Sequence, residues 1–401
     1  ILFDRHPRDR VAKVAPWLTL DGDPYPAIID GKILWIIDGY TTSAGYPNSR
    51  FVNLANTGDA LTSRSNAVAS LDDKNVNYIR NSVKATVDAY DGTVSLYQWD
   101  EKDPVLATWS KAFPGSVQPK SEISPALLAH IRYPEDMFRV QRDILSAYHV
   151  TTADAFYGGQ DFWRVPLDPS SFGSNSGNQP PYYLTMQIPG QTKPTFSLYT
   201  PFVPRGGREN LTALAVVNSD AGDEYGKITV LQLPRSTNIA GPSQVSSNFE
   251  AKPEVATSLS LLRQGGSDVV LGNLLTLPVG KGLLYVQPVY VRATGNTAAY
   301  PLLQKVLVSF GDQIGFSETL QGALDQVFGG NSGTTVSDNQ SNTPINGGTG
   351  SSQAIRSAIA SLQSAYADLE AAQKRLDGAA EDKARARVKA AIAALISAQN
   401  R

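Results

Sequence analysis

Short runs of alternating apolar and polar residues, broken by frequent turn signals, dominate residues 1–329 of the chain. Residues 26–30 and 33–38 flank Gly31-Lys32, and the dipeptide Asp30-Gly31 is a strong signal for a β-hairpin. Other apolar runs bounded by turn residues predict further strands. We expect these at 94–99, 182–188, 196–203, 211–217, 228–233, 269–277, 283–291 and 305–310.

Helical spacing of apolar residues occurs in fewer places. It predicts a helix over 77–90, where apolar side chains recur every four residues. Ser124-Pro125 combines an N-cap residue with proline at the first helical position, and it begins a short helix that stops near residue 133. Three more helices are expected at 135–148, 253–263 and 317–328.

Several of these strands follow one another without a helix between them, which favours an α+β fold over a doubly wound parallel sheet. We expect a large body at 1–329 with a predominantly antiparallel sheet and several short helices. Within it, strands 211–217 and 228–233 would form a hairpin around the polar loop 218–227.

Composition separates two further regions from this body. Residues 330–353 contain one charge, Asp338, and almost no large apolar side chain, so they predict a polar flexible linker. Residues 354–401 are rich in alanine and lack proline, and their apolar residues recur at steps of four and three. This spacing predicts a helical hairpin divided at Asp377-Gly378, with one long helix or a coiled coil as the alternative.

Charge also distinguishes this helical tail. Residues 354–401 carry eight Lys/Arg and five Asp/Glu, so the tail has a net charge of 8 − 5 = +3. The whole chain carries −2, which leaves −2 − 3 = −5 for the remainder. This opposition of charge predicts that the tail self-associates or docks on the body.

The overall composition excludes several classes of function. Only 18% of residues are charged and the net charge is near zero, whereas nucleic-acid binding requires a basic face. The nucleotide-binding glycine motifs are absent, and Gly280-Lys281-Gly282 lacks the spacing of a P-loop. There is no cysteine, which removes disulfides and thiolate metal sites, and no apolar run approaches about 18 residues. The chain starts at Ile1 as if within a longer segment, so we expect a fragment or a processed product.

Catalytic candidates are few and weak. His130 and His149 lie at the ends of a helical pair, and Asp136 or Asp161 would be the partner carboxylate. A hydrogen-bonded structural role is the simpler interpretation of His130, and Asp136 suits the first turn of a helix. Asp161 belongs to the aromatic-rich stretch 156–166, which would suit a sugar or peptide groove but more simply forms a packed loop. We therefore assign no catalytic residue and favour a protein that is not an enzyme.

Two loops could offer oxygen ligands to calcium. One is Asp21-Gly22-Asp23, and the other is the loop at the tip of the second predicted hairpin. Neither fits the twelve-residue calcium pattern, and turns are rich in these residues for backbone reasons. No cofactor is therefore predicted, and calcium is kept as a weak hypothesis. The better candidate ligands are Asn218, Asp220, Asp223 and Glu224.

Several long strings, in the same order, resemble one known family. They are WLTLDGDPYPAIIDGKILWIIDGYTTSAGYPNS (17–49), NYIRNSVKATVDAYDGTVSLYQW (77–99), IRYPEDMFRVQRDILSAYHV (131–150) and SLSLLRQGGSDVVLGNLLTLPVGKGLLYVQPVYVRA (258–293). The chain resembles an uncharacterised protein family of large multi-pass membrane proteins of actinobacteria and cyanobacteria. The resemblance implies N-terminal transmembrane helices outside this chain and a location at the cell membrane, with this domain on the extracytoplasmic side. The family has no assigned reaction, so it supplies no catalytic residues.

Three functions stay open at this point. The leading one is a non-enzymatic envelope module that binds or scaffolds a lipid, a glycan or a protein partner. A cell-envelope hydrolase acting on glycan or lipid is the first alternative, and the periplasmic gating domain of a transporter is the second. A groove without clustered titratable groups would favour the first function, and converging carboxylates or a His–carboxylate pair would favour the hydrolase.

Overall fold

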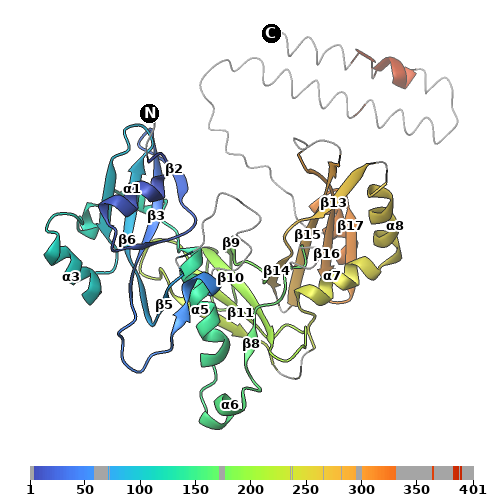
Figure 1. The fold of residues 1–401 in the computed structure, drawn as a ribbon. Coiled ribbons are helices and arrows are strands. Elements are labelled where there is room, and N and C mark those ends of the chain that lie inside the picture. The colour runs from blue at the N-terminus through green and yellow to red at the C-terminus, as the bar shows by residue number, and fades with distance from the viewer. Residues whose placement is uncertain are drawn as a thin grey trace. The chain divides into compact units, whose positions relative to one another are not determined.

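We describe the protein from a computed structural model, shown in Figure 1. Contacts divide the chain into two units, Ile1–Thr334 and Thr335–Arg401. Of the predicted linker, residues 330–353, the structure describes only Gly330. The described residues of the predicted tail are helical. The choice between a helical hairpin and one long helix falls on residues outside the described ones. The structure describes residues 4–57, 71, 73–170, 177–234, 236, 238–264, 266–280, 282–294, 300–330, 364, 383–387 and 389–390.

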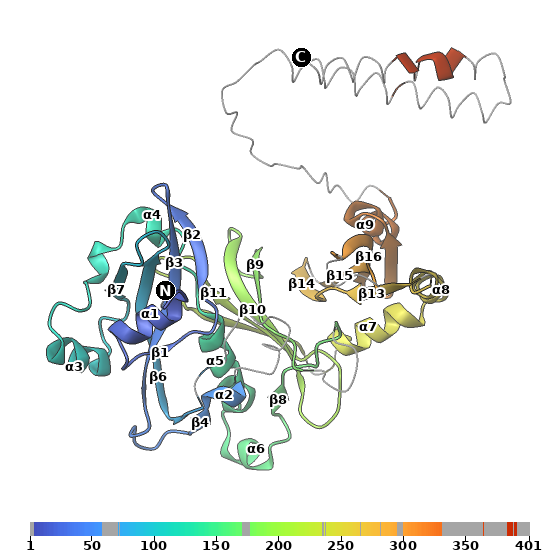
Figure 2. The ribbon, with the colours of Figure 1, turned by 45° about the horizontal axis from the view of Figure 1, so that its top comes forward.

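The first sheet of the larger unit has the strand order β1-β3-β6-β7, with β2 also paired to β3. Every pairing in it is antiparallel. A separate two-stranded ladder joins β4, labelled in Figure 2, to β5, labelled in Figure 1. The strands are β1 (Thr19–Leu20), β2 (Tyr25–Ile29), β3 (Lys32–Ser43), β4 (Val52–Asn53), β5 (Asn75–Val76), β6 (Tyr78–Asp88) and β7 (Val94–Gln98).

The hairpin predicted at the start of the chain is confirmed. Ile29 of β2 pairs with Lys32 of β3, so Asp30 and Gly31 form a two-residue loop. Their φ angles are 50° and 78°, both in the left-handed region that this turn requires and that Asp and Gly tolerate best. The turn dipeptide therefore fixes the register of the first two long strands.

The helix predicted over 77–90 is wrong, because Tyr78–Asp88 forms strand β6 between β3 and β7. Val83, Ala85 and Val87 all belong to one hydrophobic core. A spacing of four residues equals two strand periods as well as about one helical turn, so it does not separate the two structures. Pairing on both sides of the strand decides the outcome.

The second sheet has the order β12-β11-β10-β8, with β9 also paired to β10. The four strands predicted between residues 182 and 233 are confirmed, and β11 pairs with β12 as the predicted hairpin. The strands are β8 (Trp163–Arg164), β9 (Tyr182–Met186), β10 (Thr195–Pro204), β11 (Ala213–Asn218) and β12 (Ile228–Gln232).

The third sheet has the order β13-β15-β16-β17, with β14 also paired to β15. The single strand predicted at 269–277 is wrong, because two strands interrupted at Gly272 occupy this segment. A Cβ at Gly272 would lie 2.6 Å from the Pro288 ring, so the absence of a side chain permits this break. The strands are β13 (Ser267–Leu271), β14 (Leu275–Val279), β15 (Gly282–Ala293), β16 (Leu302–Phe310) and β17 (Gln313–Ser317).

Helices cover these sheets, and the predicted α+β class is confirmed. Ser124 caps α4 as expected, since its Oγ accepts from the amide of Leu127 at 3.1 Å. Predicted helices match α4, α5, α8 and α9, whereas α1, α2, α3, α6 and α7 lack a sequence prediction. The helices are α1 (Pro7–Val14), α2 (Leu54–Thr57), α3 (Pro104–Ala112), α4 (Pro125–Leu128), α5 (Glu135–Tyr148), α6 (Ala153–Gly158), α7 (Pro242–Ala251), α8 (Pro253–Leu262) and α9 (Leu320–Phe328).

Distinct hydrophobic cores join these layers. One packs α7 and α8 against strands of the second and third sheets. Another packs α5 against the second sheet and takes in Tyr40 of β3, so α5 connects the first two sheets. Both views show α5 between them (Figures 1 and 2). This helix therefore experiences a different environment on each face.

Gly315 of β17 permits α9 to pack closely on the third sheet. A Cβ at Gly315 would lie 2.0 Å from the carbonyl oxygen of Ala323, whereas a Cβ at Gly222 meets nothing within 4 Å. We expect Gly315→Ala to lower the free energy of unfolding by about 1–3 kcal/mol, because the helix must move away from the strand. Urea unfolding of Gly315→Ala beside the control Gly222→Ala measures this, and equal stabilities would contradict the packing described.

Candidate functional site

Five charged side chains lie buried where the first sheet meets α5, and we call them the buried charge cluster. Each is at most 6% exposed. Burial of charge is costly unless each group is paired and hydrogen-bonded, so their partners decide what the cluster can do. The members are Asp21, Asp38, Lys84, Asp136 and Arg139.

The centre of the cluster is an ion pair between neighbouring strands. Asp38 of β3 is the direct register partner of Lys84 of β6, which places both side chains on one face of the sheet. Lys84 Nζ pairs with Asp38 Oδ1 and also donates to Tyr225 Oη at 2.8 Å and to the Arg132 carbonyl at 3.2 Å. Asn81 Nδ2 donates to the same carboxylate at 2.8 Å. All three ammonium protons thus have acceptors.

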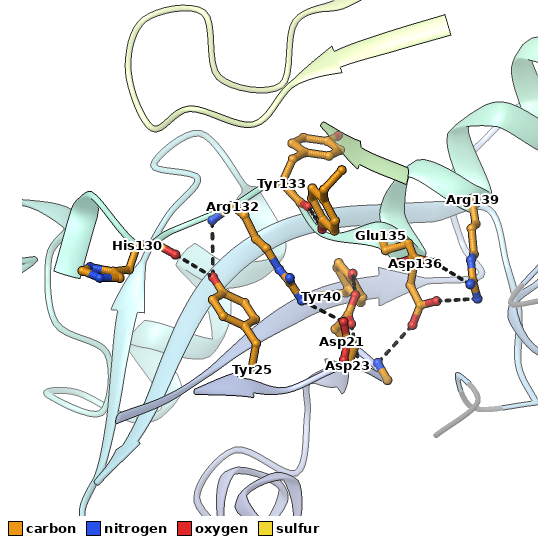
Figure 3. Close-up of polar contacts among 12 residues, drawn as sticks. Asp21, Asp23, Tyr25, Tyr40, His130, Arg132, Tyr133, Glu135, Asp136 and Arg139 are labelled. Atoms are coloured by element: carbon orange, nitrogen blue, oxygen red, sulfur yellow. Dashed lines mark hydrogen bonds and ion pairs between the residues drawn. The ribbon is translucent and has the colours of Figure 1, made fainter. Parts of the chain in front are cut away.

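A second carboxylate, Asp21, lies beside this pair. Tyr40 Oη donates to its Oδ2, and the Asp23 amide donates to its Oδ1 at 2.9 Å. The amide of Gly22, which lies between Asp21 and Asp23, donates to Asp136 Oδ2 at 3.0 Å and so ties this loop to α5. Figure 3 shows these acidic side chains converging from the strand end and the helix.

The first turns of α5 supply the third part of the cluster. Arg139 Nη2 lies 2.5 Å from Glu135 Oε1, and its Nη1 lies 3.5 Å from Asp136 Oδ1. Both acids occupy the first turn, where the helix dipole stabilises negative charge, and Arg139 follows one turn later. One guanidinium therefore binds two carboxylates of its own helix.

Arg132 closes the outer side of the site. Its guanidinium pairs with Asp23 at 2.7 Å and stacks over the rings of Tyr25 and Tyr183, 4.0 and 4.7 Å from their centres. Tyr25 Oη donates to the His130 carbonyl at 3.3 Å (Figure 3). Aromatic rings around a guanidinium reduce its contact with water and strengthen its interactions.

Burial changes the acidity of these groups. It raises the pKa of Asp21 well above the ordinary value, and the charges of Asp136 and Asp38 raise it further. Burial also raises the pKa of Asp136, although Arg139 acts in the opposite direction. The pKa of Lys84 is lowered by burial, which the Asp38 charge opposes. A proton on Asp21 would remove one of three neighbouring negative charges.

The carboxylates of the buried charge cluster accept hydrogen bonds from backbone amides and from tyrosine and asparagine side chains of the chain itself. Among the described residues, no group of three or more His, Cys, Asp or Glu side chains is arranged to hold a metal ion. The cluster joins β3 to β6 through the Lys84–Asp38 pair, and it joins α5 to the loop after β1 through the hydrogen bond from Gly22 to Asp136.

The four predicted catalytic candidates do not form one site. His130 is exposed, and its Nδ1 lies 2.7 Å from the Ala126 carbonyl oxygen. Both ring nitrogens of His149 lie within 3.0 Å of backbone carbonyl oxygens, one of which belongs to Asp161. His149 thus meets the backbone of Asp161, while Asp136 belongs to the cluster.

The predicted calcium ligands lie in the β11–β12 loop and make the contacts of a turn. Asn218 Oδ1 accepts from the amide of Asp220 at 2.9 Å, and Asp220 Oδ2 accepts from a backbone amide of β10 at 3.1 Å. Glu224 pairs with Lys227 at 2.5 Å, and Asp223 lies in the same loop. Calcium binding at this loop stays a prediction.

Sequence reasoning missed the cluster's central pair and the role of Asp21. Asp38 and Lys84 stand singly within apolar strands, at WIIDGY and SVKATV. A lone charge at an inward position of a strand is a signal for a buried ion pair. That signal is read only when the segment is recognised as a strand, which failed for β6.

Three antiparallel sheets with covering helices, and a buried ionic cluster between the first sheet and α5, define this chain as an α+β protein. The model of an uncharacterised protein family (UPF0182) matches residues 1–262, and the chain belongs to this family. No solved structure matches it.

Relatives from actinobacteria extend well beyond this chain. A UPF0182 protein of Leifsonia xyli subsp. xyli is 48% identical, and the match covers 100% of the chain and 45% of the relative. The UPF0182 protein of Thermobifida fusca is 57% identical, and the match covers 82% of the chain and 32% of the relative. That of Bifidobacterium longum is 53% identical, and the match covers 84% of the chain and 33% of the relative. The chain thus spans a third to less than half of these proteins. Within the described residues, no helix has the length and apolar character needed to cross a membrane.

Removing the lysine of the central pair would leave Asp38 buried without its counter-charge. We expect Lys84→Met to lower the free energy of unfolding by about 3–5 kcal/mol. The control is Lys227→Met, which breaks an exposed pair of side chains 63% and 59% exposed and should cost at most about 1 kcal/mol. Chemical denaturation measures both, and similar small losses would show that the central pair is not desolvated.

The raised pKa of Asp21 predicts a particular pH dependence. The folded state binds this proton more tightly than the unfolded state, so its contribution to stability is complete below the ordinary pKa of 3.8. It is lost as pH rises from there through the raised pKa. The unfolding free energy of the wild type minus that of Asp21→Asn should therefore fall as the pH rises above the ordinary pKa of 3.8. A constant or rising difference would refute a raised pKa.

Proposed function

We propose that the chain is the extracytoplasmic region of a larger cell-envelope membrane protein and that it works as a binding or scaffold module. The family membership and the length of the relatives support this proposal, because more than half of each compared relative lies outside the matched part. The low charge content of 18% suits an exported, loop-rich surface.

One observation carries the preference for binding over catalysis. The carboxylates of the buried charge cluster and both candidate histidines are engaged by groups of the chain itself. A general acid or base needs a side chain that reaches a substrate, and a nucleophile needs a base within hydrogen-bond distance. Asp136 ties a loop to a helix, and His149 binds backbone carbonyls and stacks on Trp163 with 3.4 Å between ring centres. These are contacts that stabilise a scaffold.

The extracytoplasmic location can be tested by labelling, because the chain has no cysteine of its own. Tyr157 is 95% exposed, whereas Ala147 is 8% exposed. In the full-length protein, with any other cysteines replaced, Tyr157→Cys should react with a membrane-impermeant maleimide in intact cells. Ala147→Cys should react only after denaturation, which verifies that the labelled protein is folded.

The contrary result is equally clear. If Tyr157→Cys reacts only after the membrane is permeabilised, the domain lies on the cytoplasmic side and this part of the proposal fails. Labelling of Ala147→Cys in intact cells would instead show an unfolded product, and the experiment would be repeated at lower expression.

A further inference from the structure

A surface hollow of about 900 Å³ lies on the side of α5 that faces β8 and the loop after β10. We call it the arginine hollow, because five arginines and no lysine line it, together with two acidic residues, Asp143 and Glu209. The arginines are Arg50, Arg139, Arg142, Arg164 and Arg205. The body and linker carry a net charge of −5, so this gathering of cations is local.

Two of these arginines are buried in the hollow's inner wall. Arg139 and Arg142 are 6% and 3% exposed. Arg142 Nη1 donates to two neutral acceptors, the Gln179 carbonyl at 2.8 Å and Thr200 Oγ1 at 3.2 Å. Arg139 is also the guanidinium that binds Glu135 and Asp136, so the buried charge cluster and the hollow share this arginine.

The outer arginines have the donors that a ligand would use. Arg205 is exposed and lies over the Phe162 ring at 5.8 Å, and its guanidinium has no ion-pair partner among the described residues. Arg50 is 41% exposed and lies 3.5 Å from Asp143, an ion pair at the outer limit of hydrogen-bond distance. Arg164, by contrast, is paired with Glu209. Two guanidinium groups at the mouth can thus turn toward an incoming anion.

An aromatic wall borders the same hollow. Tyr148, Phe156 and Phe162 line it, with ring centres 5.2 Å apart in each successive pair. Tyr148 is 53% exposed and Phe156 is 36% exposed. Exposed aromatic rings beside cations suit a ligand that joins an anionic group to a less polar part.

Glu209 adds a hydrogen-bond acceptor to this wall. Its Oε2 is buried and has no hydrogen-bond partner among the described residues. The Glu209 side chain is 30% exposed, so a small rotation that turns this unpaired oxygen toward the hollow would let it accept from a ligand hydroxyl. The hollow thus offers cations, an aromatic surface and one acceptor.

We infer that the arginine hollow binds the phosphate group of a hydroxylated organic phosphate, of the glycerol phosphate type. Guanidinium forks match phosphate oxygens in pairs, which explains the choice of arginine over lysine. Glu209 accepts from a hydroxyl, and the aromatic wall contacts the carbon skeleton. The inference rests on the proposed binding function and names its ligand class. The phosphate can belong to a free metabolite or to a phosphatidylglycerol headgroup.

The test uses the 401-residue chain and two probes. Titration calorimetry with glycerol 3-phosphate measures the free compound, and co-sedimentation with phosphatidylcholine vesicles, with and without phosphatidylglycerol, measures the headgroup. We expect Arg50→Gln and Arg205→Gln each to weaken binding about tenfold, the value of one charge-assisted contact. Arg263→Gln removes an exposed arginine outside the hollow and should bind as the wild type does.

Every outcome decides the inference. Binding of either probe that both hollow variants weaken supports it, and the probe that binds identifies the source of the phosphate. It is overturned if neither probe binds, if the hollow variants bind normally, or if Arg263→Gln weakens binding equally. Unchanged unfolding temperatures of the variants exclude loss of fold. The maleimide experiment tests the location separately, so the two proposals can fail independently.

Discussion

The ion pair between Lys84 and Asp38 is the interaction on which the rest of the structure depends. It lies between the two longest strands of the first sheet, where water cannot compensate either charge. The chain therefore surrounds the pair with a tyrosine, an asparagine and a backbone carbonyl. These groups come from distant segments, so satisfying one ion pair brings β6, the segment before α5 and the loop between β11 and β12 to the same place.

Helix α5 transmits this constraint to the surface. Its first turn is tied to the first sheet through Gly22, and Arg139 is held by two acids one turn earlier. The same helix carries Arg142 into the wall of the arginine hollow. Arg139 and Arg142 are three residues apart and so lie on the same side of the helix, where a network that holds Arg139 also restricts its neighbour. The cluster thus has a role in positioning the surface that we propose to bind a ligand.

Local signals in the sequence predicted much of the fold. Asp30-Gly31 predicted the first hairpin, Ser124-Pro125 predicted the start of α4, and alternation predicted every strand of the second sheet except β8. The failures have a common cause. Residues 77–90 satisfy helical and strand periods at once, and the break at Gly272 depends on Pro288, which lies far along the chain. The arginine hollow could not be predicted from the sequence either, because Arg50, Arg142 and Arg205 are far apart along the chain and only the fold brings them together.

A double-mutant cycle on Asp38 and Lys84 tests the central claim most directly. It compares the unfolding free energies of the wild type, Asp38→Leu, Lys84→Met and the variant with both changes. If the pair is desolvated and organises its surroundings, the sum of the stability losses in the two single variants will exceed the loss in the double variant by about 2–3 kcal/mol. A coupling energy near zero would contradict the account, because it would mean that the two charges are stabilised independently of each other.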